Sequence, residues 1–323
     1  MPGFTTHYLF GVDTYHELKD KQLKQVLRRQ RQAFCLGLQG PDIFFYDIPY
    51  FVLYQKSLGA IAQAENTGAF FSYLMESRIL FLSHPICLEI ADAYICGFIG
   101  HYTLDCICHP YVYARTKYDP QHPKKDSQYF GQHAYLEVEL DNALLMAKKH
   151  LYPSEFHQEA TIHLNLLQQK VIGEMLSYAF RHTYPSLIIN EGLMHQAFRF
   201  AKIGTRFLRD PKGKKKVVAR FWEKLIFHRP YLSAMVPSDG QYFVYDPLNK
   251  SHHPWIHPWT GESSDASFLE LYQTAMELYE KRLQNYGVLL RHASDTGALS
   301  SDSVARFCQE YGNRSFLSGL SLG

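Results

Sequence analysis

The stretch GFIGHYTLDCICHPYVYAR (residues 97–115) decides how this chain folds. Its apolar and aromatic residues predict a helix that is buried in the protein core. The same helix carries His101, Asp105 and His109 at intervals of four, and a rotation of about 100° per residue places all three on one face. A carboxylate buried between two imidazoles needs hydrogen-bond partners in the core or a divalent cation. The spacing therefore indicates either a metal site or a buried polar network.

Helical periodicity extends over most of the chain. The predicted helices cover residues 15–38, 68–84, 86–109, 131–150, 153–184, 192–210 and 267–292. Pro110 should stop the buried helix, and residues 240–246 form the one candidate for a short extended segment. We therefore expect an all-α fold of about eight to ten helices. The basic loop at 210–216 suggests a metal-binding helical core over 1–210 and a packed C-terminal helical extension over 211–323, or one continuous domain.

The composition excludes several classes of protein. The formal net charge of the 323 residues is +2, which argues against a protein that coats nucleic acid, and the basic runs at 21–32 and 210–216 are expected to be solvated faces. No charge-free apolar run of about 18 residues predicts a membrane span, and the first residues do not resemble a signal peptide. The six cysteines lack the spacing of a disulfide framework, and Cys106 and Cys108 are expected in the core. We expect a cytoplasmic protein.

Four residues outside the buried helix are further candidates for the same site. His133 and Glu137 are spaced i and i+4 at the start of a helix, Asp42 follows a Gly-Pro pair, and His7 lies near the N-terminus. Alone, each has an ordinary structural explanation: a surface pair, a turn cap and an incidental histidine.

Taken in chain order, the motifs THYLFG, LGLQGPD, GHYTLDCICHPYVY and HAYLE resemble the zinc-dependent phospholipase C family. They cover roughly residues 1–145. The spacing of four between Asp105 and His109 is similar to that of an intracellular-type branch without a signal peptide. The resemblance implies an all-α fold, shared with single-strand nucleases, around two to three zinc ions.

The resemblance also implies roles for individual residues. Asp105 would bridge two ions, Asp42 would sit at the first ion and act as the base toward the attacking water, and His7 would belong to a third ion. The full set of implied metal ligands is His7, Asp42, His101, Asp105, His109, His133 and Glu137, of which the last three would hold an ion together.

Two positions stay open at this stage. The family has a histidine some twenty residues after Gly-Pro-Asp, where this chain has Gln63; either Gln63 or His84 would complete the first site. The His- and Trp-rich segment 251–262 could be a lid, an additional metal locus or a rigid surface loop.

These observations predict a zinc-dependent hydrolase of phosphodiester bonds, most similar to phospholipase C. The expected partner is a phospholipid or another phosphodiester, with peripheral membrane contact. Two alternatives stay open: a nuclease or phosphatase on the same scaffold, with nucleic acid the less favoured substrate, and a catalytically impaired metal-binding or scaffold protein.

Overall fold

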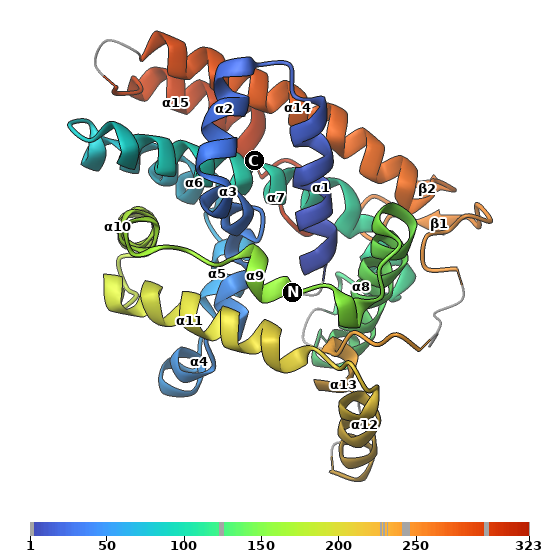
Figure 1. The fold of residues 1–323 in the computed structure, drawn as a ribbon. Helices are drawn as coiled ribbons and strands as arrows, with labels where there is room; N and C mark the ends of the chain where they lie inside the picture. Colours follow the sequence, from blue (N-terminus) through green and yellow to red (C-terminus); the bar gives the residue numbers. More distant parts are fainter. Residues whose placement is uncertain are drawn as a thin grey trace.

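The computed structural model describes residues 3–122, 126–226, 228, 230, 232–240, 246–293 and 297–322. Regular structure in these ranges is almost entirely helical, which confirms the all-α prediction (Figure 1). Strands β1 (Trp255–Ile256) and β2 (Ser263–Ser264) pair antiparallel in a short ribbon. The described part of the chain has no helix that is both long and apolar enough to cross a bilayer.

The helical elements have the following bounds. The α-helices are α1 (Phe4–Glu17), α2 (Lys21–Arg29), α3 (Arg31–Gly37), α4 (Ile48–Tyr54), α5 (Leu58–Ala64), α6 (Thr67–Glu76), α7 (Pro85–Arg115), α8 (Asp126–Lys149), α9 (Gln158–Thr161), α10 (Leu166–Thr183), α11 (Glu191–Leu208), α12 (Lys214–Ile226), α13 (Leu232–Met235), α14 (Phe268–His292) and α15 (Ser301–Phe307). Shorter turns are η1 (Gly40–Tyr46), η2 (Ser77–Phe81), η4 (Pro153–Glu155) and η5 (Cys308–Gly312).

Helix α7 is the central element, and α3 and α14 make its most extensive contacts (Figure 1). Glycines allow α3 and α7 to approach closely: a Cβ on Gly97 would lie 2.2 Å from the carbonyl oxygen of Phe34. On the other side, the buried Arg282 of α14 donates to Thr103 Oγ1 at 2.7 Å, and Tyr279 donates to the Cys96 carbonyl at 2.7 Å. Helix α7 is therefore held along its length by residues far from it in sequence.

The prediction that Pro110 stops the buried helix is wrong. Helix α7 continues through Pro110 to Arg115. A proline inside a helix removes one hydrogen bond and costs about 3 kcal/mol, because its ring displaces the carbonyl four residues earlier. That carbonyl belongs to Cys106, and the backbone of Gly319 lies against it. Packing on both sides of α7 outweighs the local cost.

Two long periodic stretches are divided where the sequence predicted continuous helix. Residues 15–38 form the end of α1, then α2 and α3, because Asp20 accepts a hydrogen bond from Leu23 N and starts a new helix. Residues 153–184 form η4, α9 and α10, and Asn165 caps α10 in a capping box with Gln168. Side-chain capping therefore sets helix boundaries here that the spacing of apolar residues does not predict.

Other predicted boundaries differ by less. Residues 68–84 become α6 followed by η2, α8 starts five residues before the predicted 131, and α11 and α14 match their predicted ranges to within two residues. Most of the expected extended segment at 240–246 lies outside the described residues. The domain boundary at 210/211 stays a prediction.

Candidate metal centre

Helix α7 presents the three predicted residues on one buried face. His101 has no exposed surface, Asp105 is 3% exposed and His109 is 8% exposed. The helical spacing brings both histidines to the same carboxylate: His101 Nε2 lies 3.0 Å from Asp105 Oδ2, and His109 Nε2 lies 3.7 Å from Asp105 Oδ1. The two oxygens of Asp105 therefore face different imidazoles.

Helix α1 adds His7 to this cluster. His7 Nε2 lies 3.1 Å from Asp105 Oδ1, and its ring stacks on His101 with centroids 4.2 Å apart. His7, His101 and Asp105 thus form one compact group of candidate metal ligands. The isolated histidine near the N-terminus is part of the site because α1 packs across α7.

Helix α8 supplies the opposite wall. His133 Nε2 lies 3.0 Å from Glu137 Oε1, and His109 Nε2 lies 3.4 Å from the same oxygen. His109, His133 and Glu137 form a second compact group. His109 belongs to the second group and lies 3.7 Å from Asp105 of the first, so these two side chains link the two groups.

The Gly-Pro-Asp turn brings Asp42 to the edge of the first group. Asp42 Oδ1 lies 4.0 Å from His101 Nε2 and accepts a hydrogen bond from Gln63 Nε2 at 2.7 Å. His84 precedes α7 by one residue and is exposed. Seventeen residues of helix separate it from His101, which corresponds to about 25 Å. Gln63, not His84, is therefore the residue next to Asp42.

Gly40 makes the close approach of this turn to His101 feasible. Its φ is +48°, and a Cβ there would lie 2.3 Å from the His101 ring. The carbonyl of Leu38 lies 3.2 Å from His101 Nδ1. A proton on Nδ1 donated to that carbonyl leaves Nε2 free to bind a metal.

Contacts with the C-terminal tail and with α8 hold His109 and the start of α1, which carries His7. The carbonyl of Phe316, in the C-terminal tail, lies 2.8 Å from His109 Nδ1. On α8, Asp141 accepts hydrogen bonds from Thr5 N, Thr6 N and Thr6 Oγ1 at 3.1, 2.8 and 2.6 Å. Asp141 thereby caps the start of α1 and fixes the turn that carries His7. Asp141 continues the i, i+4 spacing of His133 and Glu137 along α8, whereas nothing in the sequence pointed to Phe316.

The electrostatics of the site follow from charges crowded in a buried volume. Burial opposes ionisation of Asp105, but His101, His109 and His7 together hold its pKa well below the usual range. Burial likewise opposes protonation of His109, yet Asp105 and Glu137 raise its pKa to about 9. For His7, burial and the neighbouring His101 lower the pKa. The arrangement favours ionised carboxylates and concentrates negative charge where a cation would sit.

The donor atoms suit zinc. Zinc binds imidazole nitrogen and carboxylate oxygen at about 2.0–2.2 Å, and a tetrahedral site then separates its donors by roughly 3.3 Å. Four of the separations described above, those of His7 and His101 from Asp105 and of His109 and His133 from Glu137, are 3.0–3.4 Å and fall close to this value. Moreover, His101 Nε2 and Asp105 Oδ2 are buried and lack a hydrogen-bond partner among the described residues, although they face each other. Buried polar atoms of this kind normally have a partner, so the geometry fits a metal ion between them.

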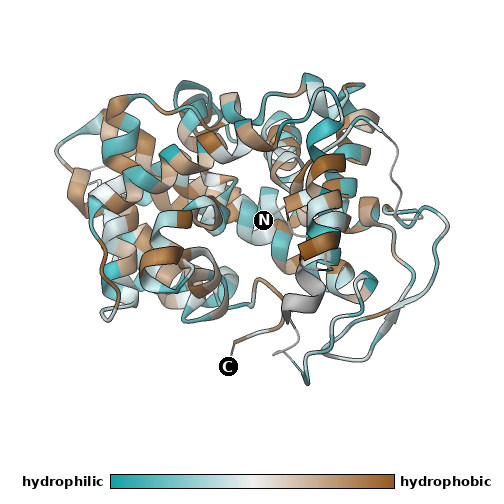
Figure 2. Ribbon diagram, turned by 90° about the horizontal axis from the view of Figure 1, so that it is seen from below, coloured by the Kyte–Doolittle hydropathy of each residue, from teal (hydrophilic) through white to brown (hydrophobic). Residues whose placement is uncertain are grey.

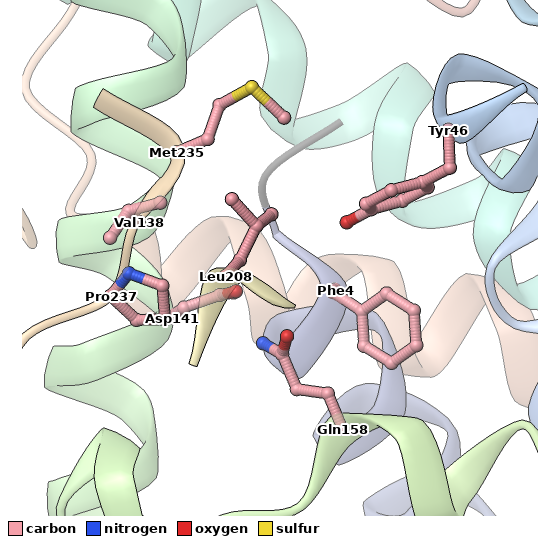
Figure 3. Close-up of a pocket in the computed structure, with 8 residues that line it drawn as sticks. All are labelled: Phe4, Tyr46, Val138, Asp141, Gln158, Leu208, Met235 and Pro237. Carbon is pink, nitrogen blue, oxygen red and sulfur yellow. The ribbon is translucent and has the colours of Figure 1, made fainter. Parts of the chain in front are cut away.

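Two small cavities adjoin the clusters. One, of about 30 Å³, lies between His7, Asp105, His109 and Glu137. The second, of about 20 Å³, is drawn in Figure 3: the Tyr46 hydroxyl points into it from one side, and apolar side chains such as Leu208 and Met235 face it from the other. Burial raises the pKa of the Tyr46 phenol, and the nearby Asp42 and Asp141 raise it further. The second cavity therefore lies beside η1, the turn that also carries Asp42, and has both polar and apolar walls.

Segment 251–262 borders the site from outside. It contains β1, and its Trp259 ring packs edge-on against Tyr113 of α7 at 5.3 Å. Tyr113 in turn contacts the His133 ring at 4.7 Å. His257 Nδ1 accepts hydrogen bonds from the backbone of residues 259 and 260, which makes it part of a structured turn. The segment therefore contacts Tyr113, which in turn packs against His133.

The fold and the site define an all-α protein with a buried centre of histidines and carboxylates. A family model for zinc dependent phospholipase C matches residues 6–184. This range is more than half of the chain, and the chain belongs to the zinc-dependent phospholipase C family. Neither curated proteins nor solved structures gave a match. All seven predicted ligands lie within the matched range, whereas Phe316 lies outside it.

Proposed function

We propose that this protein is a zinc-dependent hydrolase of phosphodiester bonds with phospholipids as its substrates. The observation that carries the proposal is the pair of buried histidine–carboxylate groups joined at Asp105 and His109. Family membership supports the zinc dependence and the phospholipase C-like chemistry. Two neighbouring groups of ligands are what hydrolysis of a phosphate diester needs, because charge develops on both the attacking and the leaving oxygen.

We assign the ligands by proximity. His101, Asp105 and His7 form one set, with Asp42 at its edge, and His109, His133 and Glu137 form the other, with Asp105 between the two sets. When bound, zinc supplies Lewis-acid polarisation of the phosphate ester and of the attacking water.

The remaining chemistry belongs to side chains of the chain itself. Asp42 accepts the proton of the attacking water with one carboxylate oxygen, while Gln63 holds the other by donating to Oδ1 at 2.7 Å. The carbonyls of Leu38 and Phe316 hold the Nδ1 protons of His101 and His109, which keeps both rings in the orientation needed for binding.

The test is elemental analysis of the chain purified without added metal. We expect two or three zinc ions per chain, lost together in Asp105→Ala and retained in Asp302→Ala, a matched change on exposed α15. Activity is then compared on p-nitrophenyl phosphorylcholine, bis-p-nitrophenyl phosphate, p-nitrophenyl phosphate and single-stranded DNA. Preference for the choline ester supports a phospholipase. Preference for DNA or the monoester assigns a nuclease or phosphatase, and bound zinc with no hydrolysis assigns a scaffold.

The cytoplasmic location stays a prediction. All six cysteines have free thiols, and five of them are buried. Free buried thiols are typical of proteins in a reducing compartment. Fractionation of cells that express a tagged chain would test the location.

A further inference from the structure

Helix α12 presents its apolar face to solvent. Six large apolar side chains, each 55–61% exposed, lie on that face: Val217, Val218, Phe221, Trp222, Leu225 and Ile226. At 100° per residue, these positions occupy a continuous arc of about 180°. Half of the helix circumference is therefore apolar and accessible in the part of the chain that the structure describes.

The opposite face of α12 is polar and buried. Lys216 is 4% exposed, and its ammonium lies over the Tyr135 ring of α8 at 4.9 Å. The Lys216 backbone N–H donates to Asp210 Oδ2 at 3.0 Å, and Glu223, 6% exposed, accepts a hydrogen bond from Ser233 N at 3.1 Å. Polar contacts thus fix α12 in an orientation that turns its apolar half outward. A helix that only needed to stabilise the fold would be oriented the other way.

Cations lie beside the apolar arc. Lys214, Arg220 and Lys224 are all exposed. Lys214 lies at the start of the helix, whereas Arg220 and Lys224 border the arc on one side. An exposed helix with Phe and Trp on one face and flanking Lys and Arg matches the composition of helices that lie in the interface of an anionic bilayer.

Other exposed apolar residues project from the same side of the molecule. In Figure 1, α4 and α12 lie in the lower part of the molecule, below α11. Figure 2 views the molecule from this side, with hydrophobic and hydrophilic residues mixed along the helices. The apolar residues more than 45% exposed on α4 and α11 are Ile48, Phe51, Val52, Leu53, Ile203 and Phe207. Phe207 lies beside the start of α12, with the Lys215 ammonium 5.2 Å from its ring.

This side of the molecule is connected to the metal centre. Helix α12 lies in the chain between Leu208 and Met235, which both line the cavity beside Tyr46 (Figure 3). Tyr46 itself packs against Gly204 of α11, where an added Cβ would lie 2.3 Å from its ring. A surface that bound at α11 and α12 would therefore lie next to this cavity and to η1, the turn that carries Asp42.

We propose that α12, together with the exposed apolar residues of α4 and α11, docks this protein on the surface of a bilayer that contains anionic lipids. The proposal rests on the proposed function, because it names the surface through which the site reaches lipid. A second copy of the chain is a poorer occupant, since pairing α12 with itself would bring Arg220 and Lys224 of both copies together. A bilayer accepts separate apolar ridges and attracts the flanking cations.

Vesicle binding of the full chain tests the proposal. Sedimentation is measured with vesicles of phosphatidylcholine alone and with added phosphatidylglycerol, at low and high salt. We expect binding that increases with phosphatidylglycerol and decreases with salt. The double variant Phe221→Asp/Trp222→Asp should bind at least about tenfold more weakly. The matched control, Ile79→Asp/Ile86→Asp, changes two residues of equal exposure at η2 and the start of α7 and should bind like the wild type.

The outcomes separate this surface from the catalytic proposal. Loss of hydrolysis on vesicles with unchanged hydrolysis of a water-soluble ester in the α12 variant supports both proposals. Vesicle binding lost in the α12 variant, with no hydrolysis of any ester by the wild type, supports the surface and overturns the function. Equal binding by wild type and α12 variant, or no vesicle binding at all, overturns the surface. A wild-type dimer that the α12 variant dissociates, without vesicle binding, assigns the face to self-association instead.

Discussion

The Phe316 carbonyl and the His109 imidazole connect the C-terminal tail to the candidate metal centre: His109 Nδ1 lies 2.8 Å from the Phe316 oxygen, across 207 residues of sequence. The same tail is held by Tyr102, whose hydroxyl donates to the Arg314 carbonyl at 2.8 Å, and the Phe316 ring packs edge-on against Tyr102. Residues beyond the family match therefore orient His109, a candidate ligand within it.

Phe316→Ala should weaken zinc binding. Loss of the ring removes its packing on Tyr102 and His101, so the carbonyl is held less firmly against His109. Such supporting contacts are worth about 10- to 100-fold in metal affinity. Truncating a buried Phe also costs about 3–5 kcal/mol of stability. Competition with a chromophoric chelator measures the affinity. Phe307→Ala, equally buried but packed on Phe71 and Tyr311, is the matched control. Equal zinc loss in both variants would show that Phe316 acts only through stability.

Gly40→Ala should displace His101. The backbone there has a positive φ, and the new Cβ would overlap the imidazole. Gly213→Ala is a matched control, because Gly213 also has a positive φ but no atom within 4 Å of an added Cβ. The control should lose about 1–2 kcal/mol from backbone strain alone. We expect a larger loss of stability for Gly40→Ala and a lower zinc content by elemental analysis. Zinc content equal to that of Gly213→Ala would contradict the assignment of His101.

Gln63→Ala should slow hydrolysis without removing zinc. The side chain donates to Asp42 Oδ1, and a hydrogen bond to a charged group is worth about 1.5–3 kcal/mol, or roughly 10- to 150-fold in rate. Gln63→His, by contrast, offers an imidazole to the first set of ligands and should increase zinc affinity. Gln55→Ala, at an exposed glutamine, controls for nonspecific effects. An unchanged kcat in Gln63→Ala would remove Gln63 from the site.

Arg78→Met should destabilise the protein in a pH-dependent way. Arg78 Nε lies 2.6 Å from the buried Asp92, and removing one partner of a buried pair costs about 3–5 kcal/mol. Burial raises the pKa of Asp92, and Arg78 opposes that rise. Without Arg78 the folded pKa rises further above the unfolded value, so the folded state favours the protonated acid. The destabilisation should be small at low pH and grow as the pH rises toward neutrality.

Chemical denaturation of wild type and variant across this pH range measures the difference. Arg29→Met is the control, since its pair with Glu89 is exposed and should matter less at every pH. A constant difference between Arg78→Met and wild type would mean that Asp92 does not carry the effect.

The sequence predicted much of the site because helical spacing alone places several of its residues side by side. His101, Asp105 and His109 share a face by helical spacing alone, and His133 and Glu137 pair for the same reason. In the structure, the imidazole of His101 lies 3.0 Å from the carboxylate of Asp105, and that of His133 lies 3.0 Å from the carboxylate of Glu137.

The sequence did not predict features that depend on contacts between distant segments. Pro110 has a strong local tendency to end a helix, but α3 and α14 hold α7 together beyond it. New helices start at Asp20 and Asn165 because each side chain caps a helix N-terminus. The spacing of apolar residues continues across both positions and does not reveal these starts. The outward face of α12 depends on polar partners, such as Glu223 and Ser233, that periodicity alone cannot pair.

By itself, then, the sequence determined an all-α chain with ligands at helical spacing, because the 3.6-residue repeat fixes which side chains share a face. The tertiary structure decided which helices meet. In the structure, His7 contacts Asp105, and the Phe316 carbonyl contacts His109. Gln63, and not His84, lies next to Asp42. These contacts arise from packing and burial summed over the whole core, which no spacing within one segment encodes.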